Sequence, residues 1–97
     1  MDLLQQCAQW FENGEHQKIV DAIEALPAEE RTPELDSELA RAYNNVAEAT
    51  DRKLFRKAVA LLKRHEAYFE GDHRWNFRLG YAYYYLDQEG RALRHFR

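Results

Sequence analysis

Residues able to do acid–base or metal chemistry gather in the stretch HEAYFEGDH, which spans residues 65–73. It brings His65, Glu66, Asp72 and His73 together in sequence. Two histidines bind one zinc ion from a helix when the spacing H-E-x-x-H sets them on the same helical face. Here Gly71 interrupts the helix between them, so we predict no metal site. We expect solvated positions at helix ends for the four histidines of the chain, which are His16, His65, His73 and His95.

Nucleophilic chemistry has one further candidate, the single cysteine Cys7. It stands at the small-residue position of a helical pattern that recurs along the chain, which favours a buried packing role over reactivity. The chain has no Gly-rich phosphate loop and no Ser/His/Asp arrangement at a catalytic spacing. We therefore predict that the protein is not an enzyme and uses no cofactor and no metal. A lone cysteine excludes an internal disulfide framework and is typical of a reducing, cytoplasmic location.

A basic run, RKLFRKAVALLKR at residues 52–64, carries six cationic side chains between apolar residues. As a helix it is amphipathic, and a solvated charged face is the expected reading. Binding of an acidic protein or of nucleic acid is the alternative, with nucleic acid unlikely because the whole chain is acidic. Residues 1–51 hold 12 acidic and 3 basic side chains, a balance of −9, whereas residues 52–97 hold 5 acidic and 11 basic, a balance of +6.

The stretch RWNFRLGYAYYYLDQEG, residues 74–90, crowds four tyrosines into five positions. At about 100° per residue, Tyr84 and Tyr85 each fall within about 60° of Tyr81 on a helix. Tyr83 points the other way, towards a core. The remaining face is aromatic and basic, and it consists of Arg74, Phe77, Arg78, Tyr81, Tyr84 and Tyr85.

Apolar spacing predicts that helices position all of these residues, and only 4 Gly and 2 Pro interrupt the chain. The connections carry turn and cap signals: Asn13–Gly14, Pro27, Thr32–Pro33, Asp51 and Gly71. We predict about six helices in an all-α domain, at residues 2–12, 15–26, 33–49, 52–69, 73–86 and from 89 to the chain end.

The predicted helices repeat one pattern three times. A small residue is followed three positions later by a large aromatic residue, and then by apolar residues on the next helix. The copies are Gln6, Cys7, Trp10, Ile19 and Ile23; Leu39, Ala40, Tyr43, Ala58 and Leu62; and Leu79, Gly80, Tyr83, Ala92 and Phe96. The small residue allows two helices to approach closely, and the aromatic residue fills the space between them.

This pattern resembles the tetratricopeptide repeat family, whose unit is a helix–turn–helix of about 34 residues. The resemblance implies an α-solenoid of antiparallel helix pairs forming a right-handed superhelix. It divides the single domain into repeats at about 1–32, 33–72 and 73–97. The third copy departs from the family pattern at Asn76, where a tryptophan is usual. The middle copy holds six extra residues, which we expect to lengthen its helices or their turn.

In that family the first helix of each pair lines a concave groove that receives a peptide or helix of another protein. The resemblance thus implies a protein-interaction module, and the arginines and tyrosines of the predicted face favour an acidic or aromatic partner. Family members that clamp chaperone C-termini need further basic and asparagine residues that are absent here, so chaperone tails are not expected. In the first copy the equivalent face carries Leu4 and Phe11. The predicted groove consists of Arg41, Asn44, Asn45, Arg74, Phe77, Arg78, Tyr81, Tyr84 and Tyr85.

Two alternatives stay open at this point. The aromatic face could instead cover a neighbouring helix or another subunit. The chain could also be a structural or oligomerisation segment of a larger repeat protein, because Leu93 and Phe96 on the last predicted helix lack the helix that normally covers such a face. They would then contact a second copy. MDLLQQCAQW has no basic segment ahead of an apolar one, so we expect neither a signal peptide nor a membrane partner.

Overall fold

The computed structural model describes residues 2–48 and 50–86. Their regular secondary structure is helical, which confirms the all-α prediction. The elements are α1 (Leu3–Glu12), α2 (His16–Glu24), the short 3₁₀ helix η1 (Ala28–Glu30), α3 (Pro33–Val46), α4 (Arg52–Arg64) and α5 (His73–Tyr85). The predicted sixth helix, with Leu93 and Phe96, lies outside the described residues.

The cap and turn residues act as predicted from their types. The side chains of Thr32 and Asp51 each accept a hydrogen bond from a backbone N–H in the first turn of the following helix, and Asp72, which was not predicted as a cap, does the same at the start of α5. These bonds satisfy donors that a helix start leaves unpaired. Gly14 and Gly71 have φ of 73° and 81° and so turn the chain where a side chain would be strained.

The predicted end of the fourth helix is wrong, because α4 stops at Arg64 and not at residue 69. Side chains after this point bind α3 and hold the chain in turns. His65 Nε2 lies 2.8 Å from Asp36 Oδ2, and the Tyr68 hydroxyl donates to Glu34. α3 likewise ends at Val46 rather than at residue 49. The extra residues of the middle copy therefore lie in the connection between α3 and α4.

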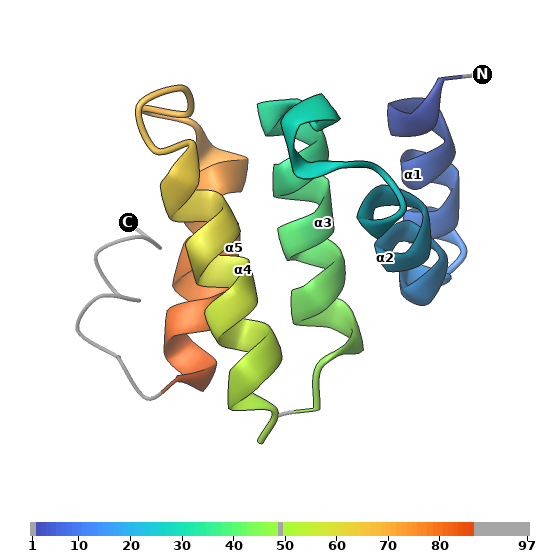
Figure 1. Ribbon diagram of the computed structural model, residues 1–97. Helices are drawn as coiled ribbons and strands as arrows, with labels where there is room; N and C mark the ends of the chain where they lie inside the picture. The colour runs from blue at the N-terminus through green and yellow to red at the C-terminus, as the bar shows by residue number, and fades with distance from the viewer. Residues whose placement is uncertain (1, 49, 87–97) are drawn as a thin grey trace.

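The helices form two layers. Each α-helix packs against the next along the chain, and α3 also contacts both α1 and α5. As Figure 1 shows, α3 stands in the middle, with α1 and α2 on one side and α4 and α5 on the other. One layer thus contains α1, α3 and α5, and the other contains α2 and α4. α3 is the element that every other helix is built around.

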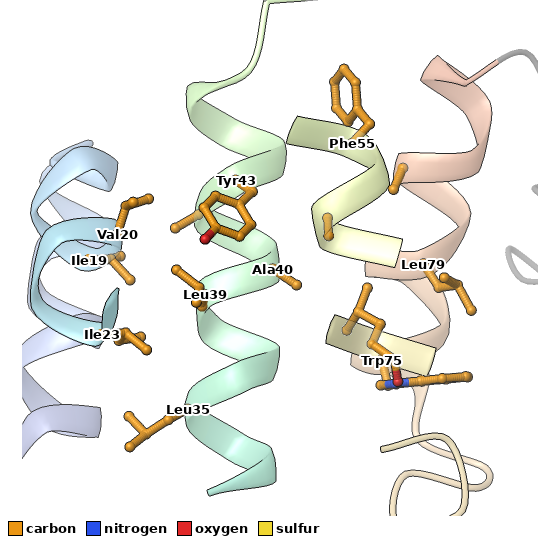
Figure 2. Packing of buried hydrophobic residues seen from close by; sticks show 14 of the residues in the cluster. Ile19, Val20, Ile23, Leu35, Leu39, Ala40, Tyr43, Phe55, Trp75 and Leu79 are labelled. Carbon is orange, nitrogen blue, oxygen red and sulfur yellow. The ribbon is translucent and has the colours of Figure 1, made fainter. Parts of the chain in front are cut away.

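Buried apolar residues form a core on two opposite faces of α3 (Figure 2). On one side Leu35, Leu39 and Tyr43 pack against the apolar face of α2, and on the other Ala40 points towards α4 and α5. Trp75 is also buried, and its Nε1 donates to the Leu62 carbonyl at 2.8 Å, which ties α5 to the end of α4. Within the described residues, no helix has the length and apolar character needed to cross a bilayer.

Candidate functional site

A cavity of about 290 Å³ opens where α1, α3 and α5 meet. Seven of the nine residues of the predicted groove line it, and Phe11 of α1 joins them. Tyr84 and Tyr85 are the two predicted residues that do not. The lining residues are Phe11, Arg41, Asn44, Asn45, Arg74, Phe77, Arg78 and Tyr81. The structure therefore brings together residues that are up to 70 positions apart in sequence.

Arg78 forms part of the cavity floor and is buried, with 7 % of its surface exposed. Its Nη1 donates to Ser37 Oγ at 2.6 Å, and its Nη2 donates to Glu38 Oε1 at 3.1 Å. The expectation that Arg78 lies apart from the core is wrong. The guanidinium can be buried because two residues of α3 satisfy its donors.

Electrostatics on the cavity floor are dominated by arginine. Burial lowers the pKa of Arg78, and the neighbouring Glu38 carboxylate opposes that effect. Glu38 also accepts a hydrogen bond from Arg41, so one carboxylate serves two guanidinium groups. Arg74 at the rim is exposed and has no ion-pair partner among the described residues. The cavity thus keeps a positive balance that can attract an anionic group.

Asn44 also lines the cavity, and one of its amide atoms is buried without a partner. The residue is buried, and its Nδ2 donates to the Arg78 carbonyl at 3.1 Å. Its Oδ1 has no hydrogen-bond partner within the described part of the chain. A buried acceptor without a partner is costly to the fold. The amide of Asn45, which is exposed, lies on the same lining.

Aromatic side chains form the walls. Phe11 and Phe77 are 39 % and 59 % exposed, which is high for phenylalanine. The Arg41 guanidinium carbon lies 3.8 Å from the centre of the Phe11 ring, a cation–π contact between α3 and α1. The Tyr81 ring lies 6.4 Å from that of Phe77, centre to centre. These walls offer apolar contact beside the charged floor.

A smaller hollow of about 160 Å³ continues the cavity along α3. The two spaces share Arg74 and Arg78, and the second also borders Glu34, Glu38 and Asp72. The concave surface of α3 and α5 is therefore elongated. Its character changes from cationic and aromatic near α1 to more acidic near the start of α5.

The tyrosine cluster divides differently from the sequence expectation. Tyr83 is buried, as predicted. Tyr85 stacks on Phe55 of α4, with ring centres 5.0 Å apart and planes at 7°, and Tyr81 also contacts Phe55. Of these four tyrosines, Tyr84 alone does not pack against the core, and its side chain is 53 % exposed. Tyr81 therefore serves both core and cavity, whereas Tyr85 is held by α4 packing.

The expectation of solvated histidines is wrong for two of them. His65 pairs with Asp36, which is 1 % exposed, and Arg31 Nε lies 3.3 Å from the other oxygen of that carboxylate. Nothing in the sequence signals this buried acid, because an aspartate in the first turn of a helix is usually solvated.

His16 packs edge-on against Phe11. Its pKa is lowered, first by burial and then by repulsion from the Arg41 guanidinium. His73 is exposed, and His95 lies outside the described residues.

Cys7 is fully buried, as expected from its place in the repeat pattern. Burial raises the pKa of its thiol, Glu38 adds to the effect and Arg41 opposes it. A buried thiol of raised pKa is a poor nucleophile. Residues 2–48 and 50–86 contain no group of three potential metal ligands.

Comparisons with known proteins return nothing for this chain. No protein-family model, no curated protein and no solved structure matches it.

Proposed function

We propose that the cavity between α1, α3 and α5 is the binding groove of a protein-interaction module. Its ligand is an extended peptide segment of another protein. The observation that carries this proposal is the lining: arginines, asparagines and exposed phenylalanines from three helices meet around one open space. Peptide-binding grooves combine apolar walls with a few well-placed polar groups in this way.

The chemistry of the lining defines the kind of peptide. The exposed amide of Asn45 can pair with the peptide backbone without reading side chains. Arg74 has no ion-pair partner among the described residues and can bind a carboxylate. Phe11 and Phe77 suit an apolar or aromatic side chain. The ligand therefore carries an acidic residue close to an aromatic one.

The proposal includes an α-solenoid of tetratricopeptide type as the scaffold. It is supported by the burial of the small residues Cys7, Ala40 and Gly80, one in each copy of the pattern. The aromatic residues Tyr43 and Tyr83 are buried as well, and Trp10 packs against the core. In this arrangement α1, α3 and α5 are the first helices of successive pairs, and their common face is the inner face of the array.

A displayed library of extended peptides rich in Asp, Glu and aromatic residues tests the proposal. Selected peptides would be labelled, and their affinity measured by fluorescence anisotropy against the parent chain, Arg74→Ala and Asn45→Ala. Both positions are exposed, so both variants should fold. We expect each to weaken binding by about tenfold, the usual scale for one lost charged or amide contact.

The matched control is Arg56→Ala, which removes an exposed arginine from α4, away from the cavity lining. It should leave peptide affinity unchanged. A library that yields no binder, or binders equally affected by Arg56→Ala and Arg74→Ala, contradicts the proposal. Arg78→Ala is unsuitable here because its guanidinium is part of the fold.

A further inference from the structure

The hollow of about 160 Å³ beside the first cavity differs from it in charge. Among the described residues, the first cavity is lined by three arginines and no carboxylate, whereas the hollow is bordered by the carboxylates of Glu34, Glu38 and Asp72. The hollow lies where α3 and α5 begin, and both helices begin at the same end of the molecule in Figure 1. Because the two spaces have Arg74 and Arg78 in common, they form one groove whose charge changes along its length.

Two of the three carboxylates in the hollow have no cationic partner. Glu38 is paired with Arg41 and Arg78, which belong to the groove itself. Glu34 and Asp72 form no ion pair within the part of the chain that the structure describes. Both are partly exposed, so a ligand in the hollow can reach them.

Neutral donors position these two side chains without removing their charge. The Tyr68 hydroxyl donates to Glu34, and this hydrogen bond is the main cause that lowers the pKa of the Glu34 carboxyl. Asp72 Oδ1 accepts from the Trp75 N–H at 2.8 Å as the N-cap of α5, where the helix dipole favours negative charge. Both carboxylates therefore attract a cation into the hollow.

Phe69 gives the hollow an apolar wall. It is half-buried, and the Tyr68 ring stands edge-on to it with ring centres 4.9 Å apart. Lysine and arginine carry an aliphatic stem below the charged head, and such a stem can lie along an aromatic ring while the head reaches a carboxylate. The hollow thus has the chemistry of a seat for a basic side chain.

We propose that the hollow binds a lysine or arginine of the same peptide that occupies the first cavity, and that the peptide presents three kinds of side chain in a fixed order. This inference rests on the proposed function. From the middle of α5 to its start, the groove presents Phe77, then Arg74, then Asp72. The matching peptide presents an aromatic residue, then an acidic one, then a basic one.

The rise of α5 sets the spacing of these residues on the peptide. Phe77 and Asp72 are five positions apart, and Tyr81 and Asp72 are nine apart, which correspond to about 7.5 Å and about 13.5 Å along a helix. An extended peptide advances about 3.3 Å per residue. The aromatic and the basic residue should therefore be about two to four positions apart. An acidic residue at the basic position would be repelled by Glu34 and Asp72.

Selection of displayed peptide libraries against the full chain tests the proposal. One library holds a fixed Phe-Asp pair with randomised flanks, and a second holds Asp-Phe, because the order of the side chains does not set the direction of the peptide backbone. In one of the two we expect lysine or arginine to be enriched at least about threefold, the scale of one exposed ion pair. The enrichment should fall on the Asp side of the pair, about two to four positions from the phenylalanine.

Two variants assign this preference to the hollow. Glu34→Gln/Asp72→Asn removes both charges, and asparagine caps a helix as well as aspartate does, so the start of α5 should persist. The preference for lysine and arginine should then disappear. Glu34→Lys should replace it with a preference for aspartate or glutamate. Arg56→Ala, exposed on α4 and outside both spaces, is the matched control and should keep the preference of the parent chain.

A selected peptide then provides a quantitative check by fluorescence anisotropy. Replacing its basic residue with glutamine should weaken binding to the parent chain about threefold. The same replacement should leave binding to Glu34→Gln/Asp72→Asn unchanged, because the partner charges are gone. Circular dichroism establishes that each variant is folded, and if Glu34→Lys does not fold, the double variant decides alone.

The outcomes separate this inference from the proposed function. Selected peptides without a preference for lysine or arginine, or with a preference that persists in Glu34→Gln/Asp72→Asn, overturn the inference and leave the first cavity as a peptide site. Loss of the preference in Arg56→Ala would overturn it as well. If neither library yields a binder, both the inference and the proposed function are wrong.

Discussion

Arg78 and Ser37 are joined by a hydrogen bond of 2.6 Å between Nη1 and Oγ, and both residues are buried. The bond connects α5 to α3 beneath the floor of the groove. An arginine that appears on the sequence as part of a solvent-facing stripe is therefore a structural link between two helices. Its backbone takes part as well, because the Arg78 carbonyl accepts from Asn44.

Arg78→Ala should lower the free energy of unfolding by about 2–3 kcal/mol, since it removes a buried charged hydrogen-bond donor and leaves Ser37 without its partner. Arg74→Ala, at an exposed position one turn earlier, should change it by less than about 0.5 kcal/mol. Urea unfolding followed by circular dichroism measures both. Equal stabilities of the two variants would contradict the structural role of Arg78.

The sequence predicts the helices and most of the residues that line the cavity, but it does not predict how deeply each of those residues is buried. Helical periodicity depends on residue type, so the stripe of Arg74, Phe77, Arg78 and Tyr81 could be read directly. Whether an arginine on that stripe is covered depends on what the facing helix offers. Ser37 and Glu38 lie opposite Arg78, and they are 41 and 40 positions from it in the sequence. Helical periodicity does not encode contacts of that range.

The end of α4 is a second feature that helical periodicity does not predict. Residues 65–69 look helical in isolation, yet α4 ends because His65 and Tyr68 bind carboxylates on α3. Caps such as Thr32 and Asp51 were predictable because they act within three residues of themselves. Hydrogen bonds to side chains of another helix, such as those of His65 and Tyr68, could not be predicted in this way.

Asp36 is expected to be the most sensitive carboxylate of the described residues. It is 1 % exposed, and its oxygens face Arg31 and His65. Asp36→Asn should cost about 3 kcal/mol in unfolding free energy, because it leaves a partly buried arginine without its counter-charge. Glu34→Gln, which alters a more exposed acid on the same helix, should cost less than about 1 kcal/mol. A stable Asp36→Asn protein would show that the buried cluster contributes little to the fold.

The interaction between Asp36 and His65 provides a second test of the stabilising role of Asp36. In a double-mutant cycle with Asp36→Asn and His65→Gln, the interaction free energy should exceed about 1 kcal/mol, because the two side chains are in direct contact at 2.8 Å. Additive losses would mean that each residue acts through other neighbours.

Tyr84 and Tyr85 are neighbours in sequence with opposite expected roles. Tyr85 stacks on Phe55, a core residue that is 1 % exposed, whereas Tyr84 is 53 % exposed. Tyr85→Ala should lower the unfolding free energy by about 2 kcal/mol, and Tyr84→Ala by less than about 0.5 kcal/mol. Thermal unfolding compares them directly. A larger loss for Tyr84→Ala would place that residue, and not Tyr85, in the packing of α5.

His16 predicts a pH dependence of stability. Its pKa in the folded chain is lowered, first by burial and then by the Arg41 guanidinium, from an ordinary value of 6.5. Above 6.5 the ring is neutral in both the folded and the unfolded chain, so it contributes no pH dependence there. As the pH falls below 6.5, the unfolded chain binds the proton first, and stability is lost until the pH reaches the lower folded pKa.

The loss of unfolding free energy between about pH 7.5 and pH 5.5 should therefore be smaller in His16→Gln than in the parent chain. Both are measured by urea unfolding at constant ionic strength, so that screening of Arg41 does not change. Comparing the two proteins cancels the contributions of every group that both contain. Identical pH dependence would mean that neither the burial of His16 nor the nearby Arg41 guanidinium hinders its protonation. A steeper loss in His16→Gln would reverse the sign derived from its burial.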